Sequence, residues 1–277
     1  MSEVSEVARL SPSVAQKLND EGALSAWANH RLMGNLRKRP TDGQIKGTIN
    51  HASLLGDSEA IEVVTGFDNF KTKAAKEVRD DIFDRGKTPV IESKWEESLK
   101  TAEHLRELIL SRHGIDLDGA VKETRLEWTE FSRSGKAVEC SGFMDLWDQN
   151  LKVTDLKTGD GYPTPEKIAT DLARSHGLLQ DRAYRGGVAQ LMNVAIEEVD
   201  MVYLGVQMVP PYATCPARMK ASFRECSEIR WQQAIDDWAS FSESGEWSVR
   251  YGMEPAEMDA PGWLLNKALA DEAMLDE

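Results

Sequence analysis

The stretch from residue 142 to residue 159 constrains the fold of this chain more than any other part of it. Two sets of side chains alternate along its first half, as they do along a strand: Phe143, Asp145 and Trp147 on one face, Met144 and Leu146 on the other. A turn cluster follows at residues 148–150, and residues 153–157 have the pattern of a returning strand. The stretch therefore predicts a β-hairpin whose faces can be assigned residue by residue.

This hairpin brings three ionisable side chains together. If residues 149–151 form its loop, Asp145 lies opposite Asp155, and directly opposed residues of an antiparallel pair have Cβ atoms about 4.5–5.5 Å apart. The period of two places Lys157 on the same face as Asp155, while Leu156 points into the core. We therefore expect two carboxylates and one amine on a single face of the sheet.

Two opposed carboxylates destabilise a sheet unless something compensates their charge. A divalent cation would do so, since Mg²⁺ is commonly held by one or two carboxylates together with water and substrate phosphate. A lysine beside such an ion can hold or deprotonate a water molecule, or offset charge that develops on a phosphate. Asp-x-Lys is a common tripeptide, however, and by itself it favours an exposed ribbon with scattered charges.

Two more motifs, one on each side of the hairpin, make the pattern more specific. Gly47-Thr-Ile-Asn-His51 precedes the hairpin, and Gln180-Asp-Arg-Ala-Tyr184 follows it on a predicted helix, where a spacing of four places Gln180 and Tyr184 on one face. With Gly-x-x-Asp and Asp-x-Lys-Thr-Gly between them, these motifs resemble the RecB-type branch of the PD-(D/E)xK nuclease superfamily, and in particular its phage-encoded exonucleases. The resemblance covers residues 40–245.

The resemblance implies an α/β fold with a restriction-endonuclease-like core, in which helices flank a central mixed β-sheet and a helical part is added at the N-terminus. It divides the chain into three parts. Residues 1–115 form the helical part that carries His51, residues 116–250 form the nuclease core with a closing C-terminal helix, and residues 251–277 form an acidic tail.

The resemblance also implies a metal centre. Its ligands are His51, Asp145, Asp155 and the backbone carbonyl of Leu156, and its ion is Mg²⁺ or Mn²⁺, of which Mn²⁺ accepts an imidazole more readily. Asp145, Asp155 and Lys157 form the expected catalytic set, in which Lys157 orients or deprotonates the attacking water.

DNA contacts are expected from the helix after the hairpin. Gln180 can bond a base, a phosphate or the attacking water, and Tyr184 can stack or donate its hydroxyl. Three arginines on the same segment, Arg174, Arg182 and Arg185, are candidates for phosphate contacts.

Hydrophobic periodicity predicts the remaining elements. They are helices over residues 58–85, 95–112, 166–195 (with a break near 177) and 224–242, and strands over residues 120–128, 136–142 and 199–207. Glu123 is the nearest match to a strand glutamate that the resembled family often has before the hairpin. An exposed strand glutamate is the commoner explanation, so no role is assigned to it.

Composition limits the partners and cofactors. The net charge of −14 at pH 7 argues against a general nucleic-acid coat, and it predicts weak, salt-sensitive DNA binding unless lysines and arginines gather in one groove. Three widely spaced cysteines indicate a reducing compartment, and their number excludes the four-cysteine iron–sulfur cluster of some RecB-type nucleases. No apolar run approaches the ~20 residues that cross a bilayer, and the polar N-terminus is unlike a signal peptide. We expect no membrane partner and a cytoplasmic location, bacterial or in a phage-infected host.

The function that the resemblance implies is a divalent-metal-dependent exonuclease that hydrolyses phosphodiester bonds from DNA ends in phage or bacterial recombination or repair. A single-strand annealing or recombination protein is the partner that this role implies. Two alternatives stay open: a structure-specific or restriction-type endonuclease with the same residues, and a catalytically silent DNA-binding module on the same fold. The sequence leaves the oligomeric state open.

Overall fold

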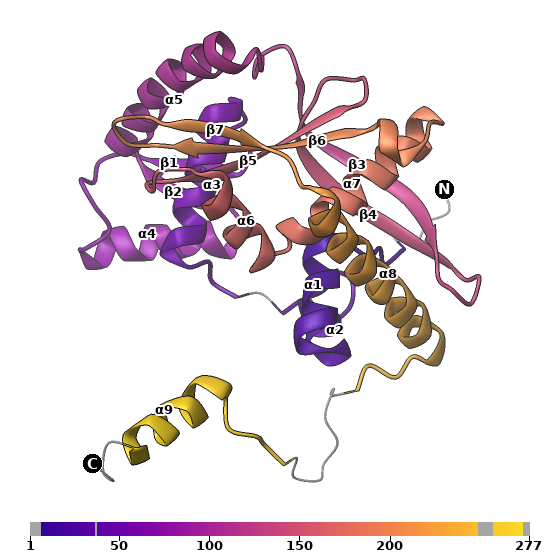
Figure 1. Cartoon of the computed structure of the whole chain (residues 1–277). Helices are drawn as coiled ribbons and strands as arrows, with labels where there is room; N and C mark the ends of the chain where they lie inside the picture. The colour runs from indigo at the N-terminus through magenta and orange to yellow at the C-terminus, as the bar shows by residue number, and fades with distance from the viewer. Residues whose placement is uncertain (1–6, 37, 249–256, 274–277) are drawn as a thin grey trace, which may run out of the picture.

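The fold is organised around a five-stranded mixed sheet with the strand order β3-β4-β5-β6-β7 (Figure 1). The computed structural model describes residues 7–36, 38–248 and 257–273. The strands are β3 (Val121–Phe131), β4 (Ala137–Trp147), β5 (Lys152–Gly159), β6 (Asp200–Gln207) and β7 (Thr214–Ala217). Neighbouring strands are antiparallel except β5 and β6, which are parallel. The expected α/β fold with a central mixed sheet is therefore confirmed.

Helices pack on both faces of this sheet. The helices of the described residues are α1 (Pro12–Glu21), α2 (Ala23–Asn29), α3 (Asp42–Leu55), α4 (Lys73–Asp84), α5 (Glu92–His113), α6 (Pro165–Ala173), α7 (Gly177–Met192), α8 (Ala221–Ser244) and α9 (Gly262–Ala273), and not all of them touch this sheet. Apolar side chains of α3 and α5 pack with Leu146, Leu156 and Leu204 of the sheet. Side chains of α1, α7 and α8 form a larger core with Val153 and Tyr203 on the other face. No helix in the described part of the chain is long and apolar enough to span a membrane.

The predicted hairpin has the expected register. Strands β4 and β5 pair Leu146 with Thr154 and Trp147 with Val153, which is the register that a loop at residues 149–151 requires. Leu156 is 1% exposed within the core, and the Nζ of Lys157 lies 2.5 Å from Oδ2 of Asp155 on the opposite side of the strand. The alternation of faces along this hairpin is confirmed.

One segment differs from its prediction. Its apolar spacing predicts a single helix over residues 58–85, whereas the structure has strand β1 (Ile61–Val64) and a helix only from Lys73. Strand β1 pairs in parallel with β2 (Thr88–Ile91). The β-branched run at residues 61–64 favours an extended backbone, Gly66 follows it at φ 78°, and the Thr72 side chain caps α4. The prediction was wrong here because a four-residue strand is too short to show its period.

The segment before α1 is tied into the sheet. The N–H of Leu10 donates to the carbonyl of Glu139, and its carbonyl accepts from the N–H of Ser141, each at 2.9 Å. Leu10 is fully buried, and α1 continues from it to pack against α8, where Asn19 donates to the Arg230 carbonyl at 2.9 Å. Helices α1 and α8, which are far apart in the sequence, therefore belong to one hydrophobic core.

The end of the chain contains a helix that the sequence analysis did not predict. Helix α9 lies within the expected acidic tail, and Figure 1 shows it apart from the rest of the described structure. Its described side chains are exposed.

Candidate active site

Three carboxylates form a row across three neighbouring strands. The register of β4 and β5 places Asp145 of β4 opposite Asp155 of β5, one position beyond the last ladder pair, Leu146 and Thr154. The register of β3 and β4 places Glu123 opposite the same Asp145, although neither residue forms a ladder pair there. The two registers therefore bring the carboxylates of Glu123, Asp145 and Asp155 close together on the sheet.

The backbone at Glu123 is strained. Its φ is 46°, in the left-handed region that a non-glycine strand residue rarely adopts, and the residue is missing from the ladder between β3 and β4. Such strain costs about 1–3 kcal/mol and collects at functional sites. Burial raises the pKa of the Glu123 carboxyl, and the charges of Asp57 and Asp155 raise it further. Strain and desolvation together make Glu123 a candidate functional residue.

Asp145 lies where β4 and β5 diverge. Its Oδ2 accepts a hydrogen bond from the backbone N–H of Leu156 at 2.6 Å, so a side chain takes the place of a ladder carbonyl. Burial raises the pKa of the Asp145 carboxyl well above its usual range, and the charge of Asp155 raises it further, while Lys157 and the Leu156 N–H oppose the shift. The bond to Leu156 fixes the orientation of this carboxylate.

His51 completes a group of candidate metal ligands. A capping box between Thr41 and Gln44 starts α3, and this helix carries His51 to the sheet, where its Nδ1 lies 3.7 Å from Oδ2 of Asp145. His51, Glu123 and Asp145 each offer one ligand atom, and these atoms lie within 4.8 Å of one another. Burial lowers the pKa of His51, which favours the neutral imidazole that binds metal.

The donor set fits a divalent cation. Carboxylate oxygens suit Mg²⁺ and Mn²⁺, and an imidazole beside them suits Mn²⁺ better. Three acids lie near a single half-buried amine, so a doubly positive ion would offset the excess negative charge. Asp155 is outside the three-residue group, because its Oδ2 faces Lys157, and its role as a ligand stays a prediction, as does that of the Leu156 carbonyl.

Lys157 is held between two oxygens. Its Nζ lies 2.5 Å from Oδ2 of Asp155, which is 2% exposed, and donates to Oε1 of Gln180 at 3.0 Å. The same ammonium lies 5.7 Å from the centre of the Tyr203 ring. With its position fixed in this way, the amine can act on a substrate without first searching through rotamers.

Gln180 and Tyr184 lie behind Lys157. The Nε2 of Gln180 donates to the Tyr184 hydroxyl at 3.4 Å, and both side chains are buried. A Cβ added to Gly142 would lie 2.4 Å from Cε1 of Tyr184, which explains the glycine of the Gly-x-x-Asp motif. The geometry makes Gln180 and Tyr184 positioning residues for Lys157. Direct contact of either with DNA stays a prediction.

The arginines expected to bind phosphate have other partners. Arg185 is buried, and its guanidinium donates to Asp181 and to two backbone carbonyls. Arg182 forms ion pairs with Glu130 at 2.9 Å and with Glu228 at 2.5 Å. Phosphate contacts by these two side chains are therefore not supported, because acids already neutralise them: Asp181, one helical turn away, for Arg185, and Glu130 and Glu228, far away in the sequence, for Arg182. Arg174, at the end of α6, is exposed.

Two clefts meet at the candidate metal ligands. One, of about 580 Å³, contains Lys157 and Gln180, and the other has a volume of about 1430 Å³. Both clefts are lined by Gly47, His51 and Asp145. The larger cleft is also lined by five cationic side chains: Lys17, Lys38, Arg39, Arg85 and Lys87.

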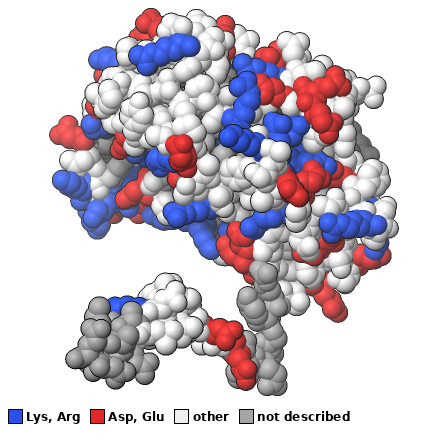
Figure 2. Space-filling view, viewed as in Figure 1, with Lys and Arg blue, Asp and Glu red and all other residues white. Residues whose placement is uncertain are grey.

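Four acids, Asp57, Glu59, Glu123 and Asp145, line the larger cleft as well, so its cations exceed its acids by only one. Figure 2 shows Lys and Arg interspersed with Asp and Glu over the face that it displays, so no broad basic surface appears there. Within the cleft, Arg39 pairs with Asp80 at 2.6 Å and Arg85 with Glu62 at 2.7 Å. A phosphate backbone would have to compete with these carboxylates.

Comparisons with known proteins identify the family and the fold. The family model of the PD-(D/E)XK nuclease superfamily matches residues 10–252. The fold is similar to a crystal structure named "Putative exonuclease" from Eubacterium rectale, with a TM-score of 0.56 and 11% identity over 96% of this chain and 98% of that chain. A phage related exonuclease from Haemophilus somnus 129PT matches with a TM-score of 0.35 and 11% identity, over 86% of this chain and 96% of that chain. No curated protein sequence matches the chain. The chain belongs to the PD-(D/E)XK nuclease superfamily.

Proposed function

We propose that the protein is a divalent-metal-dependent deoxyribonuclease that degrades DNA from its ends. The observation that carries the proposal is the row of Glu123, Asp145 and Asp155, with His51 at one side and a fixed Lys157 at the other, at the point where two clefts meet. A catalytically silent module would not need a half-buried amine held beside three acids.

The residues divide the chemistry between them. His51, Glu123, Asp145 and Asp155 would hold the ion, which supplies polarisation of the scissile phosphate and a bound water of lowered pKa. The ammonium of Lys157, clamped by a carboxylate and an amide oxygen, orients that water and offsets charge on the phosphate in the transition state. The Leu156 N–H keeps the Asp145 carboxylate turned toward the site.

Action from DNA ends is the finer part of the proposal. It is supported by the motif resemblance and by the exonuclease name of the similar structure from Eubacterium rectale. A role in recombination or repair, with a single-strand annealing protein as partner, stays a prediction of the resemblance. The competing activity is an endonuclease built on the same residues.

End-labelled linear duplex and relaxed closed-circular DNA test both parts. With Mg²⁺ or Mn²⁺ the protein should shorten the linear duplex, leave the circle intact, and lose activity in EDTA. Lys157→Ala should lower the rate by about 10²–10⁴-fold, whereas Lys152→Ala, at the start of the same strand, should retain it. A fully active Lys157→Ala protein would refute the assignment of the site, and nicking of the circle would replace exonuclease by endonuclease.

A further inference from the structure

Phe143 is an exposed aromatic residue in the larger cleft. Its side chain is 57% exposed, and it lines this cleft together with Glu123 and Asp145. Phe143 precedes Asp145 by two positions on β4, so both side chains lie on one face of the strand, with a rise of about 6.6 Å between them. A single exposed apolar side chain is common on protein surfaces, but this ring lies directly beside the candidate metal ligands.

The cross-strand neighbour of Phe143 is an arginine. The register of β3 and β4 pairs Arg125 with Phe143, and the Cβ atoms of such a pair are about 4.5–5.5 Å apart. The guanidinium of Arg125 lies 2.6 Å from Oε1 of Glu127, and that of Arg9 lies 3.0 Å from Oε2 of the same carboxylate. Two guanidinium groups therefore share one carboxylate, and the excess positive charge beside the ring attracts an anionic nucleotide.

The same face of β3 and β4 becomes acidic beyond this point. Glu127 lies opposite Ser141, and Glu139 lies opposite Thr129, whose hydroxyl donates to the Glu139 carboxylate at 3.1 Å. A DNA strand that continued along the sheet past Phe143 would bring its phosphates toward these carboxylates. The face is therefore suited to one nucleotide beside the metal ligands rather than to a long stretch of DNA.

We infer that Phe143 stacks on the terminal base of the DNA strand that is cut. The inference rests on the proposed function, since it names the part of the substrate that the same site holds. Aromatic side chains in clefts lined by lysines and arginines bind bases without regard to sequence, because every base has a π-face. Within a duplex both faces of a base are covered by its neighbours, and a base at an end has one free face. Stacking on Phe143 thus favours DNA ends over internal sites.

A cycle that changes both the protein and the DNA tests the stack. The substrates are end-labelled oligonucleotides that carry either a normal nucleotide or an abasic tetrahydrofuran residue at the 5′ end or at the 3′ end. Phe143→Ala should lower kcat/KM on normal ends by about 5- to 150-fold, the loss expected for one base–aromatic stack. An abasic residue at the end from which the strand is degraded should abolish the difference between wild type and variant. Equal losses on normal and abasic ends, or a Phe143→Ala protein with the kcat/KM of the wild type, would overturn the inference.

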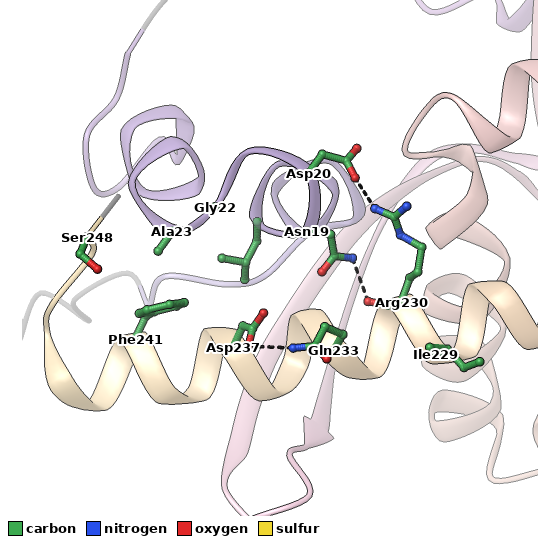
Figure 3. A pocket seen from close by; sticks show the side chains of 11 residues that line it. Asn19, Asp20, Gly22, Ala23, Ile229, Arg230, Gln233, Asp237, Phe241 and Ser248 are labelled. Carbon is green, nitrogen blue, oxygen red and sulfur yellow. Dashed lines mark hydrogen bonds and ion pairs between the residues drawn. The ribbon is translucent and has the colours of Figure 1, made fainter. Parts of the chain in front are cut away.

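Matched variants separate stacking from loss of apolar surface. Phe143→Trp keeps an aromatic ring and should retain kcat/KM, whereas Phe143→Leu should lose it as Phe143→Ala does. Phe131→Ala removes a ring that is 62% exposed at the far end of β3, outside both clefts, and should have no effect. Ile229 has the same exposure as Phe143, but it lies on α8 in a separate groove beside α1 (Figure 3), so Ile229→Ala should also be silent. A Phe143→Leu protein as active as the wild type would contradict stacking.

DNA binding distinguishes this inference from the proposed function. In a Lys157→Ala background, fluorescence anisotropy should show that Phe143→Ala raises the dissociation constant for normal ends by the same factor and leaves that for abasic ends unchanged. A wild type that cuts no DNA with any divalent metal would refute the nuclease, and the binding cycle would still decide the stack. A wild type that cuts DNA, with no coupling between Phe143 and the terminal base, would refute the stack alone. Absence of binding to every oligonucleotide would overturn both.

Discussion

Gly142 and Tyr184 form a steric pair whose disturbance should reach Lys157. A Cβ at residue 142 would lie 2.4 Å from Cε1 of Tyr184, a ring that is 4% exposed and bonded to Gln180, which in turn accepts from Lys157. Gly142→Ala should therefore overpack the core at a cost of about 1–3 kcal/mol in the free energy of unfolding. A misplacement of a catalytic group by about 1 Å can lower the reaction rate by about 10²-fold. Because the shift of Tyr184 is passed to Lys157 through Gln180, kcat should fall by about tenfold to hundredfold, while KM for DNA changes little.

A double-mutant cycle in urea measures this coupling. Tyr184→Ala alone should cost about 3–5 kcal/mol, because it leaves a cavity. In that background the methyl of Gly142→Ala enters the empty space, so the double variant should be more stable than the sum of the two losses by roughly 1–3 kcal/mol. Gly159→Ala is the matched control, since nothing lies within 4 Å of its added Cβ. Additive losses, or a Gly142→Ala protein with the stability and kcat of the wild type, would refute the reasoning.

Three further predictions concern the metal, the pH and the salt. Saturating Mn²⁺ at about 100 times its dissociation constant should stabilise the wild type by about 2.7 kcal/mol, and Glu123→Gln should remove most of that gain in a thermal melt with and without metal. Burial lowers the pKa of His30, whose Nδ1 accepts from the Leu32 N–H, so its contribution to stability is full above its unfolded value of 6.5 and declines as the pH falls below it. His30→Gln should flatten the pH dependence of urea unfolding across that value, and an unchanged slope would contradict this. Lys38→Ser with Lys87→Ser in the larger cleft should weaken DNA binding and reduce its log–log salt dependence by about 1.4–1.8, while kcat at saturating DNA stays near that of the wild type.

The sequence predicts the hairpin well because period and turn act locally. The loop centred on residue 150 sets the register of β4 and β5, so the opposition of Asp145 and Asp155 follows from counting alone. The break before α7 is equally local, and the structure confirms it between α6 and α7. The four-residue strands β1 and β2 are the counterexample, because their pairing depends on segments more than twenty residues apart.

One candidate metal ligand, Glu123, is assigned no role by the sequence analysis, although the sequence suffices to place it beside Asp145. The turn at residues 133–135 is centred on residue 134, and counting outward from it places Glu123 opposite Asp145. The positive φ of Glu123, by contrast, has no signature in its side-chain type. The pairing of Arg182 with Glu130 likewise cannot be predicted from the sequence, because 52 residues separate the two.

The union of α1 with α8 in one core sets an order for biosynthesis. Domains usually fold from the N-terminus as they leave the ribosome, at about 5–20 residues per second. Here Leu18 and the neighbouring side chains of α1 can be buried only after Trp231, Ile235 and Trp238 of α8 have been synthesised. The nascent polypeptide should therefore lack a complete core until α8 has been synthesised, and the proposed active site, whose helix α7 packs in that core, should form only then.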